Sequence, residues 1–470
     1  MNKAKKALQS RIAHLRYIRR RWAYQFRARR YRWKRRAQYL YSRLPWRQPR
    51  ETVHEKNTWN LYGDIAWWGI ANGVWLTYLS VFAVRLGASA AWLGALAALP
   101  ALVNMIWAIP SARMVERAPR RLPLVLRAGF YQRLAWLGVA LVPFFFQEHL
   151  GVVALVALAG LTTFPAATAT VAFTNLLADL VPPQDRARVV SIRSVLVSAT
   201  TTITVLVCGP ILDAIPPPAN YQVVFGVAFI AAMMSLRCVS RLQVPDETTV
   251  IHRDRPKQWI GASIRNSVRQ VTSEKAFVWY VVSSLIFNWG IYFPTPLFNI
   301  YRIRTLGASD TWIGVLTMVD SVVTIFSYLV WGRLAPRWGN RKVLIVGAFG
   351  MVAFPILTGL FRSLPLLIIP SVIAGVFSPG FSLAAFNELL ALSPAANRAR
   401  YIAVYTSAIN AAAFMAPLAG SWMAAQLDIR VALYTGGLFR FLGGLVFVAV
   451  MGWGARAARS QMPTNGQPRA

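Results

Sequence analysis

The sequence is poor in cysteine, histidine and acidic residues. Its 470 residues include 2 Cys, 4 His and 16 Asp or Glu, against 51 Lys or Arg. Cys208 and Cys238 fall near opposite ends of successive apolar segments, so we expect neither a disulfide nor a metal site. The chain also lacks a Gly-rich phosphate-binding loop that ends in Gly-Lys-Ser or Gly-Lys-Thr. We therefore expect no cofactor, no ATPase domain and no enzymatic activity.

Long apolar segments dominate the rest of the sequence. Hydrophobic residues make up 56% of the chain and occur in blocks such as 92–109, 152–172 and 431–453. A helix needs about 20 largely apolar residues to cross a hydrocarbon core of about 30 Å. Blocks of this length without period-two alternation favour helices over a β-barrel. We therefore predict an all-α membrane protein with about twelve transmembrane helices.

Arginine and lysine are distributed unevenly between the expected loops. One face carries Arg113, Arg117, Arg120, Arg121, Arg186, Arg188, Arg333, Arg337, Arg341, Lys342, Arg398 and Arg400. The other face carries only Arg85, Arg302, Arg304, Arg362 and Arg430. Short loops rich in Lys and Arg stay in the cytoplasm. We therefore expect a multi-pass protein of the inner or plasma membrane with both termini in the cytoplasm.

The N-terminal segment is strongly basic. Residues 1–50 contain 18 Lys or Arg and no Asp or Glu. Apolar residues recur there at helical spacing, which favours an amphipathic helix on the anionic inner leaflet, where each basic residue contributes about 1 kcal/mol. A topology anchor and RNA contact through arginine and aromatic side chains are the alternatives. We expect lipid, and not nucleic acid, to be its partner.

An internal repeat is the most specific feature of the sequence. Leu86-Gly87-Ala88-Ser89, then Trp92 and Gly94, recur at an offset of 220 as Leu306-Gly307-Ala308-Ser309, then Trp312 and Gly314. Asn175, Pro182, Arg186, Ala187 and Arg188 recur at an offset of 212 as Asn387, Pro394, Arg398, Ala399 and Arg400. Six expected spans separate equivalent points, so the halves share one orientation. The sequence therefore predicts two parallel six-helix repeats.

This repeat divides the chain into five expected parts. They are a basic cytoplasmic segment with an amphipathic helix at 1–58, a six-helix bundle at 59–238, a cytoplasmic loop with an interfacial helix at 239–275, a second bundle at 276–455 and a cytoplasmic tail at 456–470. The loop at 239–275 holds an amphipathic pattern in a basic stretch, for which packing against the bundle is the alternative to lying on the membrane.

The loop after the eighth expected span resembles a family signature. Residues 332–342 read Gly-Arg-Leu-Ala-Pro-Arg-Trp-Gly-Asn-Arg-Lys, which is similar to the Gly-x-Leu-x-Asp-Arg-x-Gly-Arg-Arg pattern of the major facilitator superfamily. The resemblance covers residues 60–455 and implies a secondary transporter whose two halves rock around a central site. Pro336 replaces the Asp of the pattern, whereas Glu116 takes that place in the first copy, beside Arg117.

The resemblance also implies a cytoplasmic gate at the two copies of this loop. Its candidate residues are Glu116, Arg117, Arg120, Arg121, Gly332, Arg333, Arg337 and Arg341. Exposed ion pairs contribute only about 0 to 1 kcal/mol, so such a gate can break and reform. Simple retention on the cytoplasmic side is the alternative for the arginines.

Acidic residues inside the expected spans are candidates for transport. An ionisable group there costs about 2.5 to 3.5 kcal/mol on insertion scales. Asp320 lies roughly 12 Å into the eighth span, and Thr317 and Thr324 share its helical face. We interpret Asp320 as a proton carrier or as the partner of a cationic group, with a structural ion pair as the alternative. Asp64, near the start of the first expected span at 62–84, is either a gate residue or a helix cap.

The family resemblance places the first, fourth, seventh and tenth spans around the substrate cavity. The lining residues that follow from it are Trp68, Asn72, Trp75, Thr163, Thr170, Asn288, Tyr292 and Ser378. Aromatic side chains suit amphipathic or cationic ligands, and ordinary helix packing is the alternative. Pro294 and Pro296 interrupt the seventh span, where backbone groups can face a ligand.

We expect a monomeric, proton-coupled transporter of a small organic solute. Gly209-Pro210 is partly similar to a drug-antiporter signature, which slightly favours export, although Asp213 stands where that signature has glycine. Arg133 and Arg440 lie deep in their spans and either snorkel or pair internally. Two other functions stay open at this point: a receptor or scaffold that acts through its basic N-terminal segment, and a lipid translocator.

Overall fold

Every element in the described part of the chain is a helix. The computed structural model describes residues 52–118, 120–146, 148–244, 274–394 and 398–460. By internal contacts the chain separates into the units Met1–Lys56 and Asn57–Ala470, and the packing below is that of the second. The basic segment at 1–50 and most of the loop at 239–275, with its expected interfacial helix, lie outside the described residues.

The helices follow one another with short connections. They are α2 (Val53–Arg85), α3 (Ala90–Arg117), α4 (Arg121–Phe145), α5 (Glu148–Leu180), α6 (Pro183–Ala214), α7 (Ala219–Ser240), α9 (Lys275–Tyr292), α10 (Thr295–Ile300), the π-helical turn η2 (Tyr301–Thr305), α11 (Asp310–Trp338), α12 (Asn340–Leu360), the 3-10 turn η3 (Pro365–Leu367), α13 (Ile368–Leu392), α14 (Arg398–Gln426) and α15 (Ile429–Ser460). The seventh expected span is therefore broken at Phe293 and Pro294, between α9 and α10.

Eleven candidate spans in the described residues are long and apolar enough to cross a membrane. The chain is thus a multi-pass all-α membrane protein, as the sequence predicted. The expected third span, α4, is missing from that set, since Gln132 and Arg133 interrupt its apolar run. Its packing along α5 and α7 is nevertheless extensive. The expected count of twelve spans is not established.

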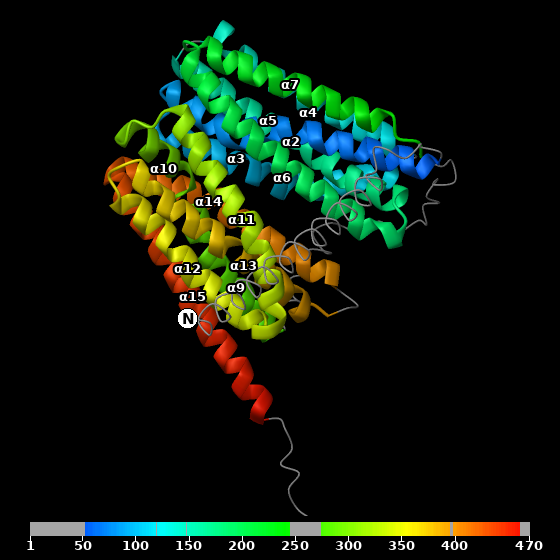
Figure 1. The fold of residues 1–470 in the computed structure, drawn as a ribbon. Helices are drawn as coiled ribbons and strands as arrows, with labels where there is room; N and C mark the ends of the chain where they lie inside the picture. The colour runs from blue at the N-terminus through cyan, green and yellow to red at the C-terminus, as the bar shows by residue number, and fades with distance from the viewer. Residues whose placement is uncertain (1–51, 119, 147, 245–273, 395–397, 461–470) are drawn as a thin grey trace, which may run out of the picture. The chain divides into compact units, whose positions relative to one another are not determined.

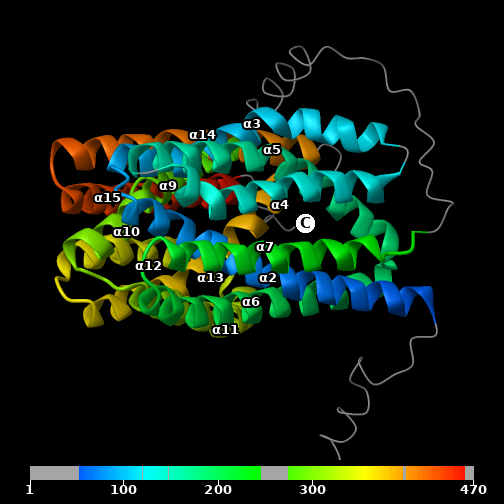
Figure 2. The same ribbon diagram turned by 90° about the horizontal axis from the view of Figure 1, so that it is seen from above.

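Helices α2–α7 form a first bundle and helices α9–α15 a second (Figure 1). Within the first, α4 lies against α5 and α7, and α3 against α5. Within the second, α12 lies against α13 and α15, and α9 against α15 and α14. The bundles meet through α3 with α14 along one edge and α6 with α11 along the other (Figure 2).

The two ends of the bundles differ in charge, and we name them accordingly. The arginine-rich end is where α3 ends at Arg117, α4 begins at Arg121 and α11 ends beside Arg337. The arginine-poor end is where α2 ends at Arg85 and α11 begins at Asp310.

The apolar core is continuous between the bundles only at the arginine-poor end of the described helices. One buried cluster there joins side chains of both bundles, among them Phe82 and Leu297. Toward the arginine-rich end each bundle has its own cluster, around Leu61 in the first and Phe277 in the second. Because membrane helices associate through close van der Waals packing and interhelical hydrogen bonds, the bundles hold together chiefly at the arginine-poor end.

The repeated Leu-Gly-Ala-Ser segment forms the same turn in both halves. Gly87 and Gly307 have φ angles of +89° and +66°, a left-handed conformation that suits glycine. The serine hydroxyl that follows each accepts a hydrogen bond from the backbone N–H three residues on, and so caps α3 and α11. The offset of 220 is therefore a structural equivalence of α3 with α11.

Candidate functional site

The two helix crossings at the arginine-poor end are related by the repeat. A Cβ on Gly94 of α3 would lie 2.9 Å from Cβ of Ser421 on α14. A Cβ on Gly314 of α11 would lie 2.9 Å from the Val205 carbonyl oxygen on α6. Neither position has room for a side chain, so glycine allows each pair of helices to approach closely.

A polar cluster, which we call the latch, joins the bundles beside the α6–α11 crossing. The carboxylate of Asp213, at the end of α6, accepts hydrogen bonds from the backbone N–H groups of Asp310 and Thr311, both 2.9 Å long. It thereby caps the N-terminus of α11 from the other bundle. The Asp310 carboxylate in turn accepts a 2.9 Å hydrogen bond from the Tyr221 hydroxyl and lies 3.6 Å from the Arg85 guanidinium.

Three further hydrogen bonds cross between the bundles at this end. Arg85 donates to the Ala308 carbonyl oxygen at 2.9 Å, and Arg304 donates to that of Ala88 at 2.7 Å. Asn299 donates to the Ser80 hydroxyl at 2.8 Å. The arginine-poor end is therefore closed by polar as well as apolar contacts.

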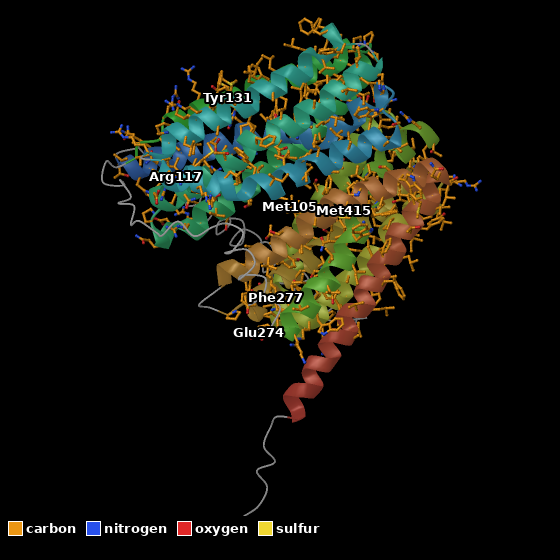
Figure 3. All side chains as sticks on the ribbon, turned by 180° about the vertical axis from the view of Figure 1, so that it is seen from behind. Met105, Arg117, Tyr131, Glu274, Phe277 and Met415 are labelled. Carbon is orange, nitrogen blue, oxygen red and sulfur yellow. The ribbon has the colours of Figure 1, made fainter. Side chains whose placement is uncertain are left out.

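The arginine-rich ends of the bundles lie apart. Figure 3 shows Arg117 at the end of the first bundle well separated from Glu274 and Phe277 at the end of the second. Met105 of α3 and Met415 of α14 lie near each other in this view, on two helices that pack against each other (Figure 3). The described helices are thus closed at one end and separated at the other.

The cap made by Asp213 yields a first prediction. Asp213→Ala would leave two backbone N–H groups of α11 without their acceptor, which disfavours the closed end by about 1 to 2 kcal/mol. In a background of Cys208→Ser and Cys238→Ser, a cysteine at Ser421, which is 1% exposed, should react with a membrane-impermeant maleimide roughly 5- to 30-fold faster. Asp213→Asn keeps one acceptor oxygen and should give a smaller increase. Unchanged labelling in both variants would contradict the role of the cap.

At the arginine-rich end, each bundle pairs a loop arginine with an acid of the following helix hairpin. Arg121, at the start of α4, forms an ion pair with Asp179 near the end of α5. Arg341, at the start of α12, lies 3.4 Å from Glu388 near the end of α13. Both pairs lie within a bundle, so they do not join the two bundles.

The other gate candidates occupy the same region without a common contact. Arg117, Arg120, Arg333 and Arg337 are exposed, and Gly332 has open space around it. The side chain of Glu116 lies outside the described residues, so its pairing with Arg117 stays a prediction. Sequence reasoning missed Asp179 and Glu388, because both acids come from a different helix than the loop signature.

Asp64 lies in a charged network inside the first bundle. Its carboxylate is 3.1 Å from the Arg193 guanidinium of α6 and accepts a 2.7 Å hydrogen bond from the Ser235 hydroxyl of α7. Arg193 also donates to the Leu61 carbonyl oxygen. Because α2 begins at Val53, Asp64 lies about three turns inside the helix, and the expectation of a helix cap is wrong.

Arg133 extends this network to an aromatic stack. It donates to the Ala232 carbonyl oxygen at 2.6 Å and to the Ser235 hydroxyl at 2.9 Å, and it lies 5.2 Å from the ring centre of Trp68. Trp136 of α4 lies between the two tryptophans of α2, with ring centres 5.4 Å from Trp68 and 4.9 Å from Trp75. Trp68 and Trp75 are both half-buried and both contact Trp136, and their role as lining residues stays a prediction.

Arg440 occupies a comparable place in the second bundle. It is 3% exposed, and it donates to the carbonyl oxygens of Gly290 and Met351 at 3.0 and 2.9 Å. Its guanidinium lies 5.8 Å from the ring centre of Phe354. Both deep arginines therefore pair internally through backbone carbonyls, and they do not snorkel.

Asp320 is half-buried on α11, and it is attracted electrostatically by Arg302 of η2. Among the described residues, no hydrogen bond or ion pair holds its carboxylate. The backbone carbonyl of Asp320 faces Gly375 of α13, where a Cβ would come within 2.8 Å. Thr317 donates to the Ile313 carbonyl oxygen at 2.9 Å, and Thr324 is half-buried.

The remaining lining candidates are spread over four helices. Asn72 is half-buried on α2. Thr163 is buried, whereas Thr170 is exposed, and each hydroxyl donates to the carbonyl four residues earlier. The others are the buried Asn288, which donates to the Ser284 carbonyl, and the half-buried Tyr292 and Ser378.

Comparison with known proteins gives a family match over most of the chain. A family model described as the Major Facilitator Superfamily matches residues 133–309 and 289–467. An uncharacterized MFS-type transporter of Methanocaldococcus jannaschii is 22% identical over 157 residues. That match covers 33% of this chain. It spans about two fifths of the length of the curated relative.

Solved structures with the same fold are also transporters. A bacterial homologue of the iron transporter ferroportin, in an inward-facing state, is 15% identical with a TM-score of 0.68, and the match covers 84% of this chain and 98% of that one. A bacterial homologue of the human lysosomal transporter Spinster, also inward-facing, is 14% identical with a TM-score of 0.63. That match covers 89% of this chain and 100% of the homologue. A D-xylose–proton symporter is 15% identical with a TM-score of 0.59, and the match covers 84% of this chain and 96% of the symporter. At these identities the likeness concerns the fold.

Proposed function

The chain belongs to the major facilitator superfamily, and on this basis we propose that it is a secondary transporter that moves a small organic solute by alternating access. The observation that carries the proposal is the closure of the helices at one end only. Both bundle crossings and the latch lie at the arginine-poor end, whereas the apolar clusters at the other end belong to single bundles. Such an arrangement suits a site that opens to one side at a time.

The charge distribution supports a sidedness for this state. Arginine-rich short loops stay in the cytoplasm, so the separated ends would face the cytoplasm and the latch would face outward. The protein would then be inward-facing, in a cell membrane, with both termini in the cytoplasm. The gate residues at the arginine-rich end would come together when the bundles rock and the latch opens.

The proposal also includes proton coupling and the direction of transport. Asp320 is the proton-coupling residue we favour, because its carboxylate has no hydrogen-bond partner among the described residues and can release a proton without breaking a contact seen there. Export is favoured over import only by Gly209-Pro210 at the end of α6. The family match gives no support to the scaffold and lipid-translocator alternatives.

Transport by the purified full chain tests the proposal. A panel of sugars, nucleosides, amino acids, organic acids and organic cations is first screened by thermal unfolding in detergent. Each solute that stabilises the protein is then followed into proteoliposomes loaded with a pH-sensitive dye. Saturable uptake above that of empty liposomes is expected for at least one solute. Its absence for every class in the panel would contradict the transporter assignment.

The role of Asp320 gives a second prediction. At a solute concentration high enough to offset any loss of affinity, Asp320→Asn should still carry the solute down its own gradient but should lose the accompanying proton flux, because the amide does not ionise near neutral pH. Asp428→Asn is the matched control, since Asp428 is an exposed acid at the arginine-poor end. It should leave both fluxes unchanged. Proton-coupled transport that is undiminished in Asp320→Asn would remove Asp320 from this role.

A further inference from the structure

Arg302 and Asp320 form an incomplete charge pair in the second bundle. Arg302 is half-buried and its guanidinium lies 6.0 Å from the ring centre of Phe298. Its Nε is buried and has no hydrogen-bond partner among the described residues. Asp320 attracts Arg302 electrostatically, yet no ion pair or hydrogen bond joins them in the described chain.

The most deeply buried arginines of the described bundles are engaged by direct contacts, whereas Arg302, like Arg186, has a buried Nε without a hydrogen-bond partner. Arg193 meets Asp64 directly, and Arg133 and Arg440 each donate to two or more acceptors. An unsatisfied buried donor costs about 1 to 3 kcal/mol and more when it is charged. Arg302 and Asp320 therefore each have unused capacity for a partner.

Charge balance restricts what that partner can be. The pair is neutral as a whole, and no other ionisable side chain of the adjoining α13 lies near Asp320, because its only such residue, Glu388, is close to the far end of that helix. A solute with a net charge would leave one uncompensated charge inside the bilayer, which is costly. A solute with one ammonium and one carboxylate keeps the sum at zero.

We propose that Arg302 and Asp320 together bind a small zwitterionic solute, with its carboxylate on the Arg302 guanidinium and its ammonium on the Asp320 carboxylate. This assignment rests on the proposed transport function and names its substrate class. Arg302 and Asp320 attract each other, and no hydrogen bond or ion pair joins them in the described chain, so each group can contact a solute. The Phe298 ring beside Arg302 offers an apolar surface for the carbon skeleton.

The test uses matched solutes on the full chain in detergent. Glycine, β-alanine, 4-aminobutyrate, 5-aminovalerate, leucine and phenylalanine are each compared with their amide and with the corresponding acid without the amino group. At least one zwitterion should raise the unfolding temperature, with a Kd at least about tenfold lower than those of its two analogues, because each lacks one charge-assisted hydrogen bond.

Variants connect that binding to the pair. Arg302→Gln and Asp320→Asn should each weaken it by at least about tenfold, and Arg302→Lys should retain part of it. Arg362→Gln, which removes an exposed arginine from the same end, should bind like the unaltered protein. Arg302→Lys and Asp320→Asn still test the pair if Arg302→Gln fails to fold.

Several results would overturn the proposal. They are an amide or an amine-free acid that binds as tightly as its zwitterion, a zwitterion whose binding survives both Arg302→Gln and Asp320→Asn, and a panel in which no zwitterion stabilises the protein. If a sugar or an organic cation is transported instead, this inference fails and the transporter assignment stands. If no solute of any class is transported, the transporter assignment itself fails.

Discussion

A protein with cysteines in place of Gly94 and Ser421, and without Cys208 and Cys238, is expected to lose transport on oxidation and to regain it on reduction. The two positions face each other across the α3–α14 crossing, with 2.9 Å between a Cβ on residue 94 and that of Ser421. A disulfide needs about 3.5 to 4.5 Å between Cβ atoms, so a small separation of the helices accommodates it. Since alternating access requires this end to open, the bond should reduce uptake to that of empty proteoliposomes.

Single-cysteine proteins control for the effect of the substitutions themselves. Gly94→Cys alone and Ser421→Cys alone receive the same oxidation, and each should transport at the same rate before and after it, although Gly94→Cys should itself lower that rate because position 94 has no room for a side chain. Formation of the bond is followed by mass spectrometry of the peptides that contain residues 94 and 421. Full transport by a protein in which the disulfide has formed would show that the arginine-poor end need not open.

Arg193→Met is expected to destabilise the first bundle strongly. It removes the ion-pair partner of Asp64, which is 5% exposed, and so leaves a buried carboxylate whose remaining direct partner in the described helices is the Ser235 hydroxyl. Breaking a buried ion pair in this way costs about 3 to 5 kcal/mol. The unfolding temperature in detergent should fall by roughly 10 °C.

A second substitution distinguishes the free-energy cost of the uncompensated buried charge from that of lost packing. Asp64→Asn added to Arg193→Met removes the uncompensated carboxylate, so the double variant should be more stable than Arg193→Met alone. Arg188→Met, an exposed arginine on the same helix, should change stability by no more than about 0.5 kcal/mol. If the double variant is instead the least stable of the three, the cost arises from packing and not from the buried charge.

The fold was predictable because it depends on features that are local in sequence. Long apolar blocks indicated membrane helices, and the repeated Leu-Gly-Ala-Ser segment indicated equivalent halves. That segment was recognisable because the turn at Gly87 and the cap at Ser89 each act within a few residues. The count of spans was less certain, since Arg133 makes α4 less apolar although it packs fully between its neighbours.

The partners of the charged residues were not predictable in the same way. Arg193 and Asp64 are 129 residues apart in sequence, and only the packing of α6 on α2 brings them together. Arg440 is satisfied by backbone carbonyls, which every residue has, so no side-chain pattern marks them. The isolation of Asp320 from α13 side chains and its attraction to Arg302 likewise emerge only from tertiary structure.

The two crossings have a consequence for how the interface arose. Gly94 and Gly314 are equivalent at the offset of 220, and at the offset of 212 Ser421 is equivalent to Gly209 of α6, which itself approaches Thr311 of α11. The same pair of surfaces is thus used twice with the roles of the bundles exchanged. This is the geometry of an isologous interface in a C2 dimer. A half-length chain with these surfaces would be self-complementary. Two unlinked copies of one ancestral bundle could therefore have closed around a shared site. Fusion of the two copies then let Asp213, Asp310 and Asp320 diverge from their equivalents.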